Sequence, residues 1–103
     1  MRRIADMGCE GGNCPNTYAT DRGTIVVQGD AVSGDTDAVV VPNELLRRHA
    51  HATGQPDWPW TVSPAGDDRV LVRGRQVTDP IVLNTINAPS HENLVELDQE
   101  AVA

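Results

Sequence analysis

Short runs of β-branched residues, separated by turn-forming residues, dominate the pattern of apolar and polar positions. Four such runs lie at residues 25–27, 39–41, 70–72 and 81–83. Branched side chains pack well on a pleated sheet, and Gly, Asp, Ser or Pro lie close to the ends of these runs. We therefore predict strands through the runs, and a further strand at residues 17–20 that reaches the first run through a hairpin turn at residues 21–23.

One helix is predicted at residues 43–52. Pro42 suits the start of a helix, because its missing N–H would have no partner in the first turn. Gly54 provides a stop. Basic and titratable side chains lie toward the C-terminal end of this segment, where positive charge complements the helix dipole: Arg47, Arg48, His49 and His51.

The two ends of the chain give weaker patterns. Residues 1–16 are rich in Gly, Asn and Pro toward their end, which predicts an irregular N-terminal arm. At the other end Ser90 is a good N-cap, and Leu94 and Leu97 share a helical face, which favours a C-terminal helix. Residues 94–97 also fit a short strand. The fold predicted for residues 1–103 is a single α+β, mostly β domain, with a small antiparallel sheet or a partly open barrel.

The second half of the chain echoes the first. Residues 24–33 align with residues 69–78 without a gap and match at Val27/Val72, Gly29/Gly74 and Val32/Val77. Each segment is followed by an apolar run and then a proline. This pattern indicates an internal duplication, with two similar β-rich halves. The alternative is that valine-rich strands with a glycine bend are common and recur here by chance.

The charge of the chain restricts the classes of molecule that it can bind. The chain has eight arginines and no lysine against fifteen acidic residues, for a net charge of -7. This charge disfavours nucleic acid and anionic membranes as partners. No stretch has the length of a transmembrane helix, and no apolar run follows Arg2 and Arg3 as in an export signal. We therefore expect a cytoplasmic protein. The use of arginine without lysine is typical of a GC-rich bacterial genome, which indicates a bacterial source.

Cys9 and Cys14, the two cysteines, flank a glycine-rich step. Two thiolates on a flexible turn could hold zinc, the candidate cofactor, with histidines completing the site. His49 and His51 point to nearly opposite sides of the predicted helix, however, and no second cysteine pair exists. A disulfide and two free thiols are the alternatives, of which free thiols are favoured in a reducing cytoplasm.

The other titratable residues do not indicate a catalytic or metal-binding site. His49 is expected to be a helix-end residue and His91 a solvent-facing one. The acidic clusters at residues 35–37 and 67–68 fit solvated turns and lack the spacing of a calcium loop. No nucleophile with an orienting partner can be identified, so we expect no enzymatic activity.

Trp58 and Trp60 flank Pro59 in a chain that has no phenylalanine. Two large rings on a rigid segment fit either a plug over a small core or an exposed docking surface. Of the two, the plug is favoured. If the rings are exposed, Trp58 and Trp60 are the candidate protein-binding residues.

Two resemblances add to these patterns. The segment Cys-Pro-Asn-Thr-Tyr-Ala-Thr-Asp-Arg-Gly-Thr at residues 14–24, with the Val-Gln-Gly strand that follows, resembles a small actinobacterial family of uncharacterised function. Genes of that family often neighbour helix-turn-helix regulators, which implies an accessory or regulatory role. Residues 39–48 are similar to the strand-Pro-Glu-Leu-Arg segment of swapped-hairpin transition-state regulators, which are dimeric DNA-binding proteins and often antitoxins. The net charge departs from that second pattern.

These observations favour a non-enzymatic regulatory or assembly module that binds a protein partner or associates with itself. A zinc- or thiol-dependent module that uses Cys9 and Cys14 is the first alternative. A dimeric swapped-hairpin DNA-binding regulator is the second, and Arg69, Arg73 and Arg75 would form its basic stripe because alternate residues share a strand face.

Overall fold

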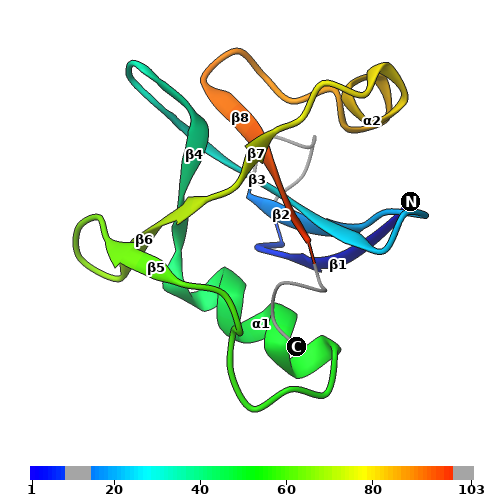
Figure 1. Cartoon of the computed structure of the whole chain (residues 1–103). Helices are drawn as coiled ribbons and strands as arrows, with labels where there is room; N and C mark the ends of the chain where they lie inside the picture. Colours follow the sequence, from blue (N-terminus) through cyan, green and yellow to red (C-terminus); the bar gives the residue numbers. More distant parts are fainter. Residues whose placement is uncertain (9–14, 99–103) are drawn as a thin grey trace.

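The computed structural model describes residues 1–8 and 15–98, and it has the predicted α+β, mostly β architecture. Figure 1 shows strands that cross near the centre of the molecule, with two helices lying well apart from each other. The elements in chain order are β1 (Arg2–Asp6), β2 (Asn16–Ala19), β3 (Thr24–Val32), β4 (Asp35–Pro42), α1 (Asn43–Ala52), β5 (Val62–Pro64), β6 (Arg69–Arg73), β7 (Arg75–Gln76), α2 (Pro80–Ile86) and β8 (Glu92–Asp98).

All of the strands in the described part of the chain belong to one antiparallel sheet, which is not closed. Its strand order is β1-β2-β3-β4-β6-β5, and β8 pairs with both β3 and β7. The predicted hairpin turn joins β2 to β3, with Ala19 opposite Ile25. At the far edge, β5 pairs with β6 in the order Val62↔Val72, Ser63↔Leu71 and Pro64↔Val70.

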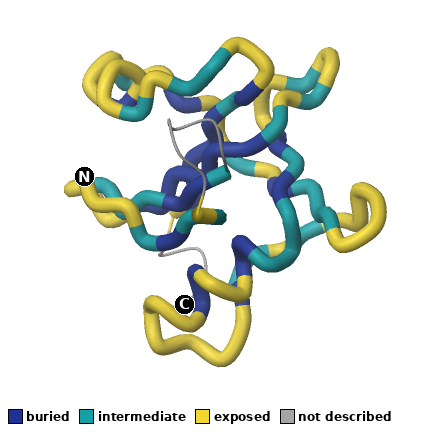
Figure 2. The backbone as a smooth tube through the Cα atoms, turned by 180° about the vertical axis from the view of Figure 1, so that it is seen from behind, coloured by how far each residue is buried: buried dark blue, intermediate teal, exposed yellow. Residues whose placement is uncertain are grey.

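β3 is the centre of the sheet, because it pairs with β2, β4 and β8. Its residues alternate between two apolar clusters. Ile25 and Val27 face the larger cluster, which includes side chains from α1, while Val26 faces a smaller one with Val82 of α2. Every residue of 24–29 is therefore buried, and Figure 2 shows buried residues gathered along the central strands.

α1 has the bounds predicted from the sequence. Its buried side chains, Leu45, Leu46, His49 and Ala50, recur at helical spacing and form one face. No side chain caps the N-terminus at Pro42, and instead the N–H of Asn43 donates to the carbonyl of Asp68 at 2.7 Å. The turn between β5 and β6 thus satisfies one of the donors that a helix leaves free at its start.

The second helix is not where the sequence predicted it. α2 contains the apolar run at residues 81–83, which was predicted to be a strand. Asp79 explains the difference, because its side chain accepts from the N–H of Ile81 at 2.9 Å and Pro80 follows it in the first turn. The predicted C-terminal helix is wrong over the described part of the tail, where residues 92–98 form β8.

β8 forms a strand because both of its faces are covered. It pairs with β3 along its whole length, from Glu92 opposite Asp30 to Asp98 opposite Thr24. Leu94 packs in the smaller cluster, and Val95 and Leu97 in the larger. Apolar residues on two faces blur the alternation that identifies a strand from sequence.

The N-terminal prediction also needs correction. Within the supposedly irregular residues 1–16, Arg2–Asp6 forms β1, which pairs with β2 and is bulged between Arg3 and Ala5. Ala5 is buried in the larger cluster. The single buried side chain and the two arginines explain why no strand pattern is visible there.

The two aligned segments do not fold alike. β3 runs without interruption through Gly29, whereas Gly74 separates β6 from β7, and the apolar runs that follow form a strand in one case and a helix in the other. The aligned glycines do share one property. A Cβ at Gly29 would lie 2.8 Å from the carbonyl oxygen of Val40, and one at Gly74 would lie 2.8 Å from that of Glu96. A shared need for close strand packing accounts for this match.

Among the described residues, no helix is both long enough and apolar enough to cross a membrane.

Candidate functional site

The two tryptophans occupy different environments. Trp58 is 9% exposed and belongs to the larger cluster, so it is a core residue. Trp60 packs against the same cluster but is only half-buried. The ring centroids lie 4.8 Å apart, and Pro59 between them fixes the backbone. Of the two predicted roles, the plug thus describes Trp58, while Trp60 remains the candidate for contact with a partner.

His49 packs against the rings of both tryptophans. Its imidazole makes edge contacts with Trp58, at a centroid distance of 5.0 Å, and with Trp60, at 6.4 Å. Its Nδ1 lies 2.8 Å from the hydroxyl of Thr17. Burial lowers the pKa of His49 to about 4, so the ring is neutral at physiological pH. The sequence suggested a helix-end residue, but the structure places His49 in the core.

The Thr17–His49 pair has the composition of a nucleophile and a base. Thr17 is 0% exposed and His49 is 1% exposed. A substrate cannot reach either group in this arrangement. The pair is therefore a buried hydrogen bond that ties α1 to β2.

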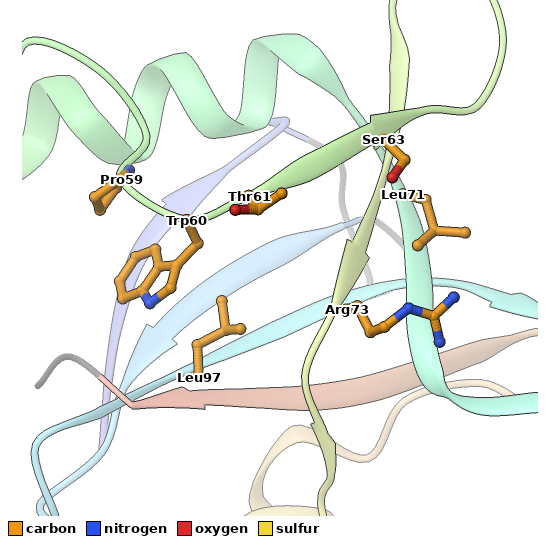
Figure 3. Close-up of a pocket in the computed structure, with 7 residues that line it drawn as sticks. All are labelled: Pro59, Trp60, Thr61, Ser63, Leu71, Arg73 and Leu97. Atoms are coloured by element: carbon orange, nitrogen blue, oxygen red, sulfur yellow. The ribbon is translucent and has the colours of Figure 1, made fainter. Parts of the chain in front are cut away.

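A groove of about 500 Å³ opens beside Trp60. Figure 3 shows Trp60 and Leu97 on one side and Leu71 and Arg73 on the other, with β5 along the top. Its lining residues come from the segment before β5 and from three strands: Pro59, Trp60, Thr61, Ser63, Leu71, Arg73 and Leu97. The groove therefore combines an aromatic wall, two leucines, two hydroxyls and one guanidinium.

Hydrogen bonding and strand pairing hold the residues on both sides of this groove in place. The indole N–H of Trp60 donates to the carbonyl of Asp98 at 3.3 Å, which links the ring to the end of β8. Leu71 lies on β6 opposite both Ser63 of β5 and Val40 of β4. These contacts hold the aromatic ring against the end of β8 and the facing leucine on β6.

Arg73 provides the charge of the groove. Its side chain is 61% exposed, and its Nη1 donates to a carboxylate oxygen of Asp35 at 2.7 Å. This hydrogen bond holds the pKa of Asp35 below its usual value. Among the described residues the Arg73 guanidinium bonds to Asp35 alone, so it can still donate to a ligand.

The predicted basic stripe is neutralised in the structure. Arg69 pairs with Asp30, Arg73 with Asp35 and Arg75 with Asp98. Each guanidinium is thus matched by a carboxylate on another strand. The sheet lacks an uncompensated basic face at these three positions.

One edge of the groove is also an edge of the sheet. Within the described ranges 1–8 and 15–98, β5 pairs with β6 only, and Ser63 and Pro64 are exposed. Edge strands offer main-chain groups to a further strand, although Pro64 lacks an N–H to contribute.

The candidate metal ligands Cys9 and Cys14 lie outside the described residues. Zinc, a disulfide and free thiols all remain predictions for that segment. Of the groove residues, the sequence identified Trp60 as a candidate for protein binding, and Arg73 only as part of the DNA-binding stripe. Leu71 and Arg73 share a face of a strand that was predicted, but Leu97 joins them only because the tail is a strand.

Comparisons with models of known protein families, with curated proteins and with solved structures give no match to this chain. A function for the groove must therefore be argued from its lining residues.

Proposed function

We propose that the protein is a non-enzymatic interaction module of the cytoplasm, and that the groove beside Trp60 binds an extended segment of a protein partner. The observation that carries the proposal is the half-buried Trp60 ring, which lies beside Leu97 and faces Leu71 across an open groove next to a sheet edge. Tryptophan and arginine are enriched among residues that dominate binding energy at interfaces.

The lining specifies the chemistry of the partner. The space between Trp60 and the two leucines suits an apolar side chain. The guanidinium of Arg73 suits an acceptor, either a carboxylate or a main-chain carbonyl. A segment in extended conformation can supply both, because its side chains alternate while its main chain runs along β5.

The regulatory role implied by the actinobacterial resemblance belongs to this proposal. Such a module would act by assembling with a protein partner. The swapped-hairpin DNA-binding alternative is disfavoured by the pairing of Arg69, Arg73 and Arg75 with carboxylates. The zinc- or thiol-dependent alternative depends on residues 9–14 and is independent of the groove.

Selection of peptides from a displayed random library on the immobilised protein tests the proposal. The selected peptides are expected to lose about 30-fold in affinity for Trp60→Ala, since an aromatic anchor contributes about 2 kcal/mol or more. Trp60→Phe is expected to retain part of the affinity, and Arg73→Gln to lose less than Trp60→Ala.

Ile81→Ala is the matched control, because Ile81 is a large apolar residue that is 75% exposed on α2, outside the groove. Thermal unfolding by circular dichroism checks that Trp60→Ala folds. Peptides that bind Trp60→Ala as tightly as the wild type would contradict the proposal, and so would a selection without any Trp60-dependent binder.

A further inference from the structure

Three metal-ligating side chains meet where β8 begins, in a region not assigned to the groove. They are Asp30 of β3, His91 just before β8 and Glu92 at its first position. One ligand atom from each lies within 4.8 Å of the others. His91 is exposed, Asp30 is half-buried and Glu92 is buried, so the cluster has an inner and an outer side.

The sheet brings these residues together. Asp30 and Glu92 are directly opposite in the β3–β8 ladder. The N–H of Ala31 donates to the carbonyl of His91 at 3.0 Å, which fixes the backbone of His91 beside β3. The N–H of Glu92 donates to the carbonyl of Pro89 at 3.0 Å and closes the turn that precedes the strand.

Hydrogen bonds and an ion pair from neighbouring side chains orient the two carboxylates. The amide of Gln28, which is 0% exposed, donates to Glu92 Oε1 at 2.7 Å. Asn16 and the hydroxyl of Tyr18 donate in turn to Gln28 Oε1, at 3.2 and 3.1 Å. Asp30 is held by Arg69. Metal-binding carboxylates are supported by such outer hydrogen bonds, which aim the free oxygen at the ion.

The two carboxylates, Asp30 and Glu92, carry more negative charge than the neighbouring cations offset. Carboxylates directly across an antiparallel pair repel each other. Arg69 offsets the charge of Asp30, but Glu92 is only 8% exposed and forms no ion pair with any described residue. A buried carboxylate is costly without a cation, and a metal ion bound between Asp30, His91 and Glu92 would offset that cost.

We propose that Asp30, His91 and Glu92 bind a divalent first-row transition metal ion, with Zn²⁺ as the expected occupant. One imidazole and two carboxylates form a nitrogen and oxygen donor set that suits Zn²⁺ and also Co²⁺. Three protein ligands leave a coordination position for water. The site uses neither Cys9 nor Cys14 and does not depend on the groove at Trp60.

Zn²⁺ and Co²⁺ titrations of a full-length Cys9→Ser, Cys14→Ser protein test this site by calorimetry and visible absorption. We expect one ion per chain and a Co²⁺ spectrum without thiolate charge transfer. His91→Ala in the same background is expected to weaken binding about 10-fold or more, and Glu92→Gln similarly. Zn²⁺ is expected to raise the melting temperature of the parent protein but not of His91→Ala.

The controls separate loss of a ligand from loss of the fold. His91 is exposed, so His91→Ala is expected to fold even if Glu92→Gln does not. His51→Ala removes another exposed histidine, on α1, and should bind as the parent protein does. Binding weaker than about 1 mM in the cysteine-free protein would overturn the proposal. Unchanged binding by His91→Ala would also overturn it.

Discussion

At the scale of single residues, the core contains polar side chains that are matched to one another. Thr24 and Arg22 both donate to the carboxylate of Glu96, and Thr17 pairs with His49. Burial alone would raise the pKa of Glu96, but the hydrogen bonds from Thr24 and Arg22 outweigh it and lower the pKa. Buried polar groups of this kind stabilise a fold only while their partners are present.

His49 makes stability depend on pH. Its pKa is about 4 in the folded protein and near 6.5 in an unfolded chain. Between these values the unfolded chain takes up a proton that the folded protein does not, so stability is complete above pH 6.5 and falls as the pH decreases toward 4. The free energy of unfolding is expected to decrease by about 2 kcal/mol between pH 7 and pH 5 from this residue.

Urea unfolding at the two pH values measures the effect. His49→Gln cannot titrate, so most of the difference between pH 7 and pH 5 should disappear in this variant. His51→Gln, an exposed neighbour, should keep the wild-type difference. An unchanged pH dependence in His49→Gln would show that another group is responsible.

At the scale of elements, the predictable segments have one clear pattern each. α1 has one apolar face and a proline at its start, and the strands at residues 24–28, 38–41 and 69–73 are rich in branched residues. The sequence predicted a helix where β8 forms and a strand where α2 forms, each because the local apolar pattern was misleading. β8 is buried on both faces, and the apolar run of α2 resembles a strand unless Asp79 and Pro80 are recognised as a helix start.

The candidate site was predictable only in part, because it is assembled across the sheet. Trp60 is conspicuous in a chain poor in aromatic residues. Leu71 lies on β6, which forms a hairpin with β5 directly after Trp60. Leu97 is brought there only by the pairing of β8 with β3, strands far apart in sequence, and Glu92 meets Asp30 through the same pairing. Such pairings depend on sheet order, which local patterns do not encode.

α2 depends on its cap, because it is a helix of seven residues whose one buried side chain is Val82. Asp79 accepts from the N–H of Ile81 and pairs with Arg22. Asp79→Ala is expected to reduce the free energy of unfolding by about 1 kcal/mol, and Asp79→Asn by less, because asparagine also caps helices. Hydrogen exchange of the α2 amides should show the loss before the sheet amides do. Equal exchange in Asp79→Ala and the wild type would argue against this role.

At the scale of the whole molecule, carboxylates outnumber arginines, and Arg22, Arg69, Arg73 and Arg75 pair with carboxylates on other elements. Binding to a DNA phosphate backbone would require these pairs to break. We therefore expect these arginines to attract a polyanion only weakly.

We expect no binding to a labelled DNA duplex up to about 10 μM protein at about 0.1 M salt, since non-specific binding depends on unpaired basic groups. Fluorescence anisotropy measures this directly. A basic DNA-binding domain of similar size serves as the positive control. Binding that weakens linearly with the logarithm of salt concentration would favour the swapped-hairpin alternative instead.

The aromatic corner formed by His49, Trp58 and Trp60 gives the protein a built-in optical probe. Trp58 and Trp60 are the only tryptophans in the chain, so nearly all of its emission excited at the red edge of the absorption band originates there. The ring of His49 contacts both indoles, so we expect its protonation to change their emission. Emission of the unlabelled protein should therefore respond to an occupant beside Trp60 and, in acid, to protonation of His49.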